Sequence, residues 1–427
     1  MKLWDKGMTI DDKILRFTVG NDREIDMHIA KYDLMATKAH VKMLGKVDLL
    51  SEEEVGQLVP ELDQLLSELA RGQFVIDPIY EDIHSKIEGE LTSRLGDVGK
   101  KVHSARSRND QVLVALHLYY KDSLKAITTK TATLFHTLID LAHRHKEQLL
   151  PGYTHLQVAM PSSFGLWFSS YAELLIDDVY LIKAAQMVVD QNPLGSAAGY
   201  GSSFPIDREY TTQLLEFHTL KYNVVAAQMA RGKSERTLSA ALGGLANTLS
   251  RMAMDICLYM SQNFDFISFP DALTTGSSIM PHKKNPDVFE LIRGKCNKIQ
   301  ALSNEMILLT NNLPSGYQRD YQLLKESMIE ALETLQDILD ISAYAIAQVE
   351  VKTVDLTQEK YQYLFSVDAV NALVMQGKSF RESYQLIGEQ IEKGTYKADR
   401  SKKHTHLGSI HNLALDKIRE KMNEALS

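Results

Sequence analysis

The stretch LSAALGGLANTLSRMAMDICLY, residues 238–259, carries large side chains at alternating steps of four and three residues. These side chains are Leu238, Leu242, Leu245, Leu249, Met252, Ile256 and Tyr259. That spacing puts them on one narrow stripe of an α-helix, the kind of stripe that packs one helix on another. The stretch therefore predicts a long helix inside a helical bundle.

Two later stretches repeat this spacing, each with one polar residue in the series. The first runs through Val288, Ile292, Lys295, Ile299, Leu302, Met306 and Leu309, and the second through Met328, Leu332, Leu335, Leu339, Ser342, Ile346 and Val349. All ten prolines lie at or before Pro314 and leave long stretches free of helix breakers. We predict an all-α fold with long helices near residues 105–150, 160–190, 230–263, 287–312 and 325–350, and no convincing strand.

The chain divides into three predicted domains. Residues 1–104 form an N-terminal helical domain, residues 105–350 the central long-helix bundle, and residues 351–427 a small C-terminal helical domain. The last of these is charged and carries a basic stretch with histidines at residues 397–406, before a short helix. Seam residues such as Leu242, Leu245, Leu249 and Met252 exceed what we expect one chain to bury, which favours an oligomer.

The composition is that of a soluble globular protein. Of 427 residues, 44% are hydrophobic and 24% charged, and the net charge of −8 favours neither nucleic acid nor a membrane surface as partner. Neither a signal peptide nor a membrane span is recognisable. Cys257 and Cys296 have no metal-type spacing and suggest a reducing compartment. We expect a cytoplasmic enzyme.

Residues 276–286, GSSIMPHKKNP, bring two hydroxyls, two ammonium groups and an amide into a segment whose prolines forbid a helix. A small base beside cationic and hydrogen-bonding groups suits proton abstraction next to a carboxylate, where negative charge accumulates. The alternative is a basic surface loop.

Residues 103–111, HSARSRNDQ, open a predicted helix with eight polar residues and one alanine. Free N–H groups at a helix start, together with Arg106 and Arg108, would bind a carboxylate. An ordinary solvated cap, with Asn109 or Asp110 as the capping residue, explains the segment equally well.

Three more segments hold candidate groups. His155 lies between a hydroxyl and an amide in GYTHLQ, residues 152–157, either as an acid or base or as a structural histidine. Residues 195–201, GSAAGYG, lack the strand and spacing of a nucleotide loop, and we expect a turn with backbone amides near a small ligand. Tyr317, Gln322 and Lys325 follow the Pro314 turn and by themselves fit a plain helix surface.

Taken together, these segments resemble a known family. Residues 276–285 match every fixed position of G-S-S-x-M-P-x-K-x-N, the signature of the fumarase/aspartase superfamily. The order of HSARSRNDQ, YTHLQ, the signature and the Tyr317 segment is similar to the argininosuccinate lyase branch, from residue 3 to about residue 390. The resemblance implies a three-domain fold around a long-helix bundle, and homotetramers whose active sites are each built by three subunits. It also implies reversible β-elimination of argininosuccinate to arginine and fumarate, without cofactor or metal.

The resemblance also implies roles for individual residues. Ser277 is the expected base, activated by neighbouring N–H groups and by Lys283, which with Asn285 would hold the carboxylate as it gains charge. His155, polarised by Glu290, would help protonate the departing nitrogen. The other expected substrate contacts are Thr37, Ser107, Arg108, Asn109, Thr154, Gln157, Arg231, Ser278, Tyr317, Gln322 and Lys325.

The chain departs from the family pattern at several polar positions. Tyr80 and Gly232 stand where the family usually has Asp, Val158 and Met160 where it has Arg and Gln, and Thr37 where it has Ser. These changes leave open a related lyase that releases fumarate from another substrate, adenylosuccinate-like or a modified argininosuccinate. A non-catalytic, crystallin-like structural protein is a third reading.

Overall fold

The computed structural model describes residues 11–427, which form two compact units. The first unit holds the described residues up to Ile127, together with Leu181–Gly244 and Lys298–Leu335. The second holds Thr128–Tyr180, Leu245–Asn297 and Gln336–Ser427. All five boundaries between the units fall inside long helices, which are α7 (Arg108–Arg144), α8 (Phe164–Val189), α10 (Val224–Met260), α11 (Asp287–Leu309) and α12 (Leu324–Ile346).

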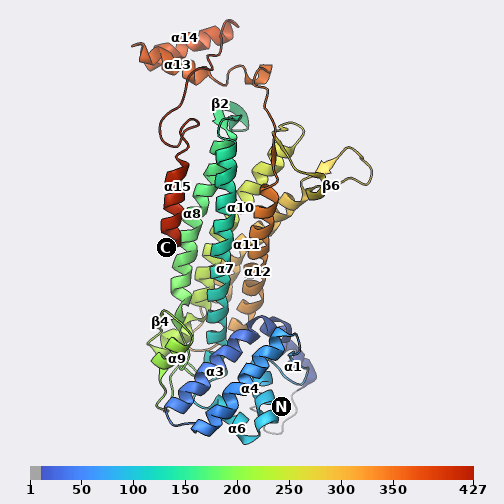
Figure 1. The fold of residues 1–427 in the computed structure, drawn as a ribbon, viewed down its shortest axis with the longest axis vertical. Helices are drawn as coiled ribbons and strands as arrows, with labels where there is room; N and C mark the ends of the chain where they lie inside the picture. The colour runs from blue at the N-terminus through green and yellow to red at the C-terminus, as the bar shows by residue number, and fades with distance from the viewer. Residues whose placement is uncertain (1–10) are drawn as a thin grey trace. The chain divides into compact units, whose positions relative to one another are not determined.

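These five helices match the five long helices predicted from the sequence, and the all-α class is confirmed (Figure 1). Within the first unit, Tyr120 on α7 donates to Glu235 on α10, and Lys298 on α11 pairs with Glu330 on α12. Within the second unit, Trp167 on α8 donates to Asp255 on α10. None of the helices in the described part of the chain has the length and apolar composition of a membrane span.

The apolar stripes are buried as predicted. Six members of the first series are at most 2% exposed, and only Tyr259 is half-buried. The third series is buried throughout, including Ser342. In the second series Lys295 is exposed and Cys296 takes the buried position beside it, so the stripe is displaced there.

The remaining elements of the first unit are shorter helices, 3₁₀ turns and one pair of strands. Its shorter helices are α1 (Asp12–Val19), α2 (Asp22–Asp26), α3 (Ala30–Lys46), α4 (Glu52–Ala70), α5 (Ile83–Leu95), α6 (Asp97–Lys100) and α9 (Arg208–Leu214), with 3₁₀ turns at Met27–Ile29, Lys101–His103 and Arg319–Leu323. Strands β3 (Gln191–Asn192) and β4 (Thr219–Leu220) pair in parallel. One buried cluster joins α3 and α7 to the segment around Phe217.

The second unit contains strands that the sequence did not predict. β1 (Leu149–Thr154) and β2 (Gln157–Ser163) form an antiparallel hairpin. Because it contains Pro151 and Pro161, which pair with one another, this segment was not predicted to form strands. At Gly152 the register shifts, and a Cβ there would lie 2.8 Å from the Met160 carbonyl oxygen, so glycine permits the bulge.

The rest of the second unit is short strands and C-terminal helices. β5 (Ile267–Ser268) pairs with β8 (Glu350–Val351), and β6 (Thr275–Gly276) pairs with β7 (Lys284–Asn285). The helices are α13 (Ser366–Met375), α14 (Phe380–Glu392) and α15 (Leu415–Leu426), with 3₁₀ turns at Asp271–Leu273 and Glu359–Tyr361. Leu149 and Val158 of the hairpin pack against a cluster around Tyr361 and Phe365.

Candidate active site

A pocket of about 240 Å³ opens in the first unit and gathers six of the residues predicted to contact substrate. These six are Arg108, Asn109, Arg231, Tyr317, Gln322 and Lys325. Around them lie Val19, Asp22, Asp26, Glu81, Asp82, His84, Val112 and Arg319. The pocket is therefore charged on most sides, with carboxylates and cations facing the same small volume.

Arg108 and Asn109 lie at the start of α7, which is capped by the side chains of Ser107 and Asp110. Asp110 accepts a 2.9 Å bond from the Ser107 N–H, and the Ser107 hydroxyl accepts a 3.3 Å bond from the Asn109 N–H. The same Asp110 carboxylate accepts from the amides of Gly195 and Ala197. The prediction that amides of residues 195–201 face a ligand is thus wrong for these two, because they serve the helix cap.

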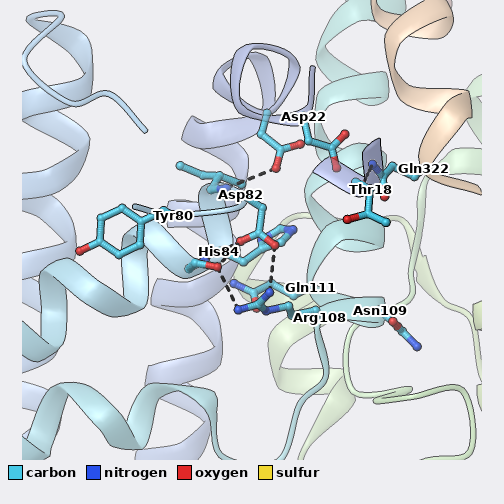
Figure 2. Close-up of polar contacts among 12 residues, drawn as sticks. Thr18, Asp22, Tyr80, Asp82, His84, Arg108, Asn109, Gln111 and Gln322 are labelled. Atoms are coloured by element: carbon cyan, nitrogen blue, oxygen red, sulfur yellow. Dashed lines mark hydrogen bonds and ion pairs between the residues drawn. The ribbon is translucent and has the colours of Figure 1, made fainter. Parts of the chain in front are cut away.

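Arg108 is fixed by the start of α5. Its guanidinium donates to Asp82 at 3.1 Å and to the Ser85 hydroxyl at 2.9 Å, while Asp82 caps the helix by accepting from the Ser85 N–H (Figure 2). Burial raises the pKa of Asp82, but the charges of His84 and Arg108 outweigh it, so this pKa lies below its ordinary value. Asp82 stays ionised and holds the guanidinium at the pocket wall.

A buried cluster lies behind this wall. His84 shares a 2.7 Å hydrogen bond with Asp33, which also accepts a 3.0 Å bond from Gln111. Burial lowers the pKa of His84, but the Asp33 carboxylate more than reverses this and leaves the pKa raised. Thr37 belongs to this cluster, since its hydroxyl donates to Asp33 and accepts from Arg106, and it is fully buried. The structure thus places Thr37 outside the residues that line the pocket, so it does not show the expected substrate contact.

Lys325 also lines the pocket and lies at the centre of a three-charge cluster. Its ammonium is 2.6 Å from Asp26 and 3.0 Å from Asp22, and the Lys325 side chain is 5% exposed. Burial lowers the pKa of Lys325, yet the two carboxylates outweigh it and keep the pKa raised. Burial is also the main cause of a raised pKa for Asp22. The cluster holds two carboxylates against one ammonium.

Arg231 reaches the pocket because α10 is interrupted there. Arg231 and Gly232 have non-helical backbone angles, and Gly232 has a φ of +88°. A Cβ on Gly232 would lie 2.7 Å from Thr310 Cγ2, and other residues rarely adopt this φ, so the family's Asp would fit only if the backbone and the Thr310 side chain shifted. Arg231 is 3% exposed and donates to the Tyr321 carbonyl oxygen at 3.2 Å. Within residues 11–427, its Nε and Nη1 have no hydrogen-bond partner.

Gln322 lines the pocket and also makes a structural hydrogen bond. Its side-chain amide donates to the Thr18 carbonyl oxygen at 2.9 Å, and Arg319 donates to the same oxygen at 2.9 Å. Both side chains therefore tie the last turn of α1 to the 3₁₀ turn before α12, as the neighbouring Thr18 and Gln322 in Figure 2 show. This tether keeps Asp22 at the pocket.

Tyr80, the most conspicuous departure, does not reach the pocket. Its ring lies over α5, where a Cβ on Gly89 would come within 2.5 Å of it, and Figure 2 shows it pointing away from Asp82 and Arg108. Its carbonyl oxygen accepts a 2.7 Å bond from Arg23. Asp22 and Asp26 do line the pocket but were not predicted from the sequence. Their spacing of four residues, which puts them on one face of α2, could have indicated them.

The signature segment forms the β6–β7 loop of the second unit, which projects from the long helices of that unit (Figure 1). The Ser277 hydroxyl oxygen accepts hydrogen bonds from the N–H groups of Ile279 at 3.3 Å and Met280 at 3.1 Å. Ser278 and Lys283 are exposed, and Asn285 donates to Thr275 at 3.5 Å. The backbone groups predicted to activate Ser277 are thus aimed at its oxygen.

The β1–β2 turn of the second unit carries Thr154, His155 and Gln157 at the surface. His155 and Leu156 occupy the two turn positions with φ of 54° and 58°. Neither residue favours this left-handed conformation, and such strain is often kept at functional sites. No hydrogen bond or ion pair joins His155 to Glu290 in the described part of the chain, so the predicted pairing is not formed within one chain.

Comparison with known proteins identifies the family and the fold of the chain. A family model described as lyase matches residues 12–301. The argininosuccinate lyase of Bacteroides fragilis is 51% identical over 425 residues, and that of Phocaeicola vulgatus is 50% identical; each alignment covers 100% of this chain and 95% of the relative. In fold, the chain is similar to an EDDS lyase variant with bound fumarate, with a TM-score of 0.76, 19% identity, and coverage of 99% and 90% of the two chains.

Proposed function

The chain belongs to the argininosuccinate lyase family of the fumarase/aspartase superfamily, and from this premise we propose that it cleaves argininosuccinate reversibly to arginine and fumarate. The observation that carries the proposal is the relatives' identity of about half over the whole chain. The pocket adds support, since it gathers six of the residues that the family resemblance predicted to contact substrate.

The proposed reaction is a β-elimination. The leaving nitrogen is bonded to one carbon of the succinate part, and the Ser277 oxygen takes a proton from the adjacent carbon. The electron pair of the broken C–H bond forms the double bond of fumarate. The carbon–nitrogen bond breaks, and the nitrogen leaves with its electron pair and receives a proton with the help of His155. The N–H groups of Ile279 and Met280 support this role of Ser277, because they stabilise negative charge on its oxygen.

The carboxylate next to the abstracted proton gains a second charge in this reaction. Lys283 and Asn285 of the β6–β7 loop are the proposed stabilisers, and both are free to turn toward a ligand because neither is buried. Glu290 would orient His155, and Ser278, Thr154 and Gln157 would contact the substrate. Arg108 and Asn109 would bind a substrate carboxylate from the pocket wall.

We propose that the active enzyme is a homotetramer with active sites shared between subunits. The expected base, Ser277, and the pocket lie in different units of the chain. The β1–β2 turn and the β6–β7 loop carry exposed candidate residues, which another subunit could contact. Contrary to the prediction, one chain buries the seam residues Leu242, Leu245, Leu249 and Met252, so they do not favour an oligomer. Other apolar residues remain exposed on the long helices, namely Leu174, Leu181, Met187, Leu291, Leu308 and Tyr344. These support association, and a cytoplasmic location stays our prediction.

The direct test offers purified protein argininosuccinate, adenylosuccinate, malate and aspartate separately and follows fumarate by its ultraviolet absorbance. We expect fumarate from argininosuccinate alone. Release from adenylosuccinate alone would instead identify the related lyase, and no release from any substrate would favour the crystallin-like reading.

A further inference from the structure

A second pocket, of about 770 Å³, lies within the second unit, and we call it the C-terminal pocket. It is lined by Met160 of β2, by Asp368, Asn371, Ala372, Met375 and Gln376 in and directly after α13, and by residues 402–406. None of the predicted site residues, which all lie in the described part of the chain, lines it. Its volume falls within the range of about 300–1,000 Å³ that is usual for small-molecule sites. The C-terminal pocket therefore has room for a ligand that the proposed reaction does not use.

Two adjacent lysines give the C-terminal pocket positive charge. The Lys402 ammonium is 3.8 Å from Asp399, a long ion pair, and the Lys403 ammonium has no ion-pair partner within residues 11–427. Both lysines are exposed and line the pocket. A phosphate monoester carries a charge of about −1.5 to −2 at neutral pH, which two neighbouring ammonium groups match. The lysines therefore favour a phosphate group as part of the ligand.

Asp368 supplies a carboxylate oxygen that the protein leaves unused. Its Oδ1 shares a 2.8 Å hydrogen bond with His404 Nε2, while its Oδ2 has no hydrogen-bond partner within residues 11–427. Asp368 is 7% exposed, and a buried acceptor without a donor is costly, more so when it is charged. A ligand that brings an O–H group to this carboxylate would remove the cost.

The segment that follows the lysines is held by its own hydrogen bonds. The His404 N–H donates to His411 Nδ1 at 3.0 Å, and the Ser409 hydroxyl donates to the His404 carbonyl oxygen at 2.7 Å. The Asn412 side-chain amide donates to the Thr405 carbonyl oxygen at 2.9 Å. Because His404 also bonds to Asp368 of α13, the backbone next to the lysines is fixed beside that helix.

The rest of the lining suits a flat heterocycle. Met160 and Met375 are both exposed, and thioethers make favourable contacts with aromatic rings. The side-chain amides of Asn371 and Gln376 can each donate and accept hydrogen bonds, as the edge of a nucleobase requires. Two methionines and two amides around one pocket therefore favour a planar base over a sugar or a simple anion.

We propose that the C-terminal pocket binds a nucleoside monophosphate. In this assignment the phosphate binds Lys402 and Lys403, a ribose hydroxyl donates to Asp368, and the base lies against Met160 and Met375. Acidic side chains hold ribose hydroxyls in this way in dinucleotide-binding folds. A nucleotide supplies the anion, the hydroxyl donor and the flat ring in one molecule. The site is additional to the pocket of the first unit, with which it shares no lining residue.

Calorimetric titration of the full chain tests the assignment with AMP and three analogues. Adenosine lacks the phosphate, ribose 5-phosphate lacks the base, and 2′,3′-dideoxyadenosine monophosphate lacks the sugar hydroxyls. We expect AMP to bind at least about tenfold more tightly than each analogue, which corresponds to about 1.4 kcal/mol. The double variant Lys402→Gln/Lys403→Gln should lose the preference over adenosine, and Met375→Ser should reduce the preference over ribose 5-phosphate.

The double variant Lys393→Gln/Lys397→Gln is the matched control. It removes two exposed lysines from the same unit, neither of which lines the C-terminal pocket, and it should bind AMP as the wild type does. Saturating arginine and fumarate should not displace AMP. Arg108→Gln, in the pocket of the first unit, should leave the affinity for AMP unchanged.

The assignment is overturned if AMP does not bind, or if the Lys402→Gln/Lys403→Gln variant keeps the full affinity. Ribose 5-phosphate binding as tightly as AMP would mean a simple phosphate site and not a nucleotide site. Equal affinity for the dideoxy analogue would overturn the role assigned to Asp368. Displacement of AMP by arginine and fumarate, or loss of AMP binding in Arg108→Gln, would place the nucleotide in the first unit and overturn the assignment as well.

Discussion

The pocket of the first unit and the β6–β7 loop of the second carry the same kinds of side chain in opposite conditions. In the pocket, Lys325 is 5% exposed and paired with two carboxylates, and Arg108 is held by Asp82 and Ser85. In the loop, Lys283 is exposed, and Lys284 pairs with Asp271 at the surface. The difference teaches that the pocket groups are held in place by buried partners, while the groups expected to do chemistry lie on an exposed loop, which we predict to move when ligand binds.

The largest effect we expect comes from the loop. Ser277→Ala should lower turnover by about 10²–10⁴-fold, because a positioned acid–base group contributes about that much. Substrate binding should change far less, since the hydroxyl acts mainly in the transition state. Steady-state kinetics of fumarate release measures both, with Ser268→Ala in β5 of the same unit as the control. Near-normal turnover in Ser277→Ala would exclude Ser277 as the base.

The next effect compares a buried lysine with an exposed one. Lys325→Met leaves Asp22 and Asp26 without their ammonium and should lower the free energy of unfolding by about 3–5 kcal/mol. Lys284→Met breaks the exposed pair with Asp271 and should cost less than about 1 kcal/mol. Urea denaturation of both variants gives the comparison. Equal losses would contradict the idea that the pocket alone is rigidly built.

A smaller effect tests the cluster behind the pocket by its dependence on pH. The folded-state pKa of His84 is raised, so its contribution is complete below the ordinary value of 6.5 and is lost as pH rises through the folded value. The folded-state pKa of Asp33 is lowered, so its contribution is present above the ordinary value of 3.8 and is lost as pH falls through the folded value.

His84→Gln should therefore destabilise the protein by about 1–3 kcal/mol between about pH 4 and pH 6.5, the usual range for a hydrogen bond to a charged group. The loss should shrink as pH rises further. Denaturation midpoints across that pH range measure it, with the exposed His218→Gln as control. A destabilisation that stayed constant up to high pH would mean that the cluster is held by packing and not by charge.

The sequence predicted what depends on side-chain period and on local signals. The long helices followed from the spacing of residues such as Leu242 and Leu249, and the cap of α7 from the HSARSRNDQ segment. The β1–β2 hairpin was missed because its prolines conceal the pairing, which depends on contacts across the turn. Asp22 was missed because its place in the pocket depends on Gln322, about 300 residues away in the chain.

The most direct test of the difference between the two regions is hydrogen exchange, followed separately in residues 270–286 and in residues 83–111. We predict that the pocket segment is protected with and without arginine and fumarate, because its groups are already paired. The loop segment should exchange quickly alone and become protected when both products are present, as closure brings Lys283 and Asn285 onto a carboxylate. Equal exchange of residues 270–286 in the two states would contradict the account.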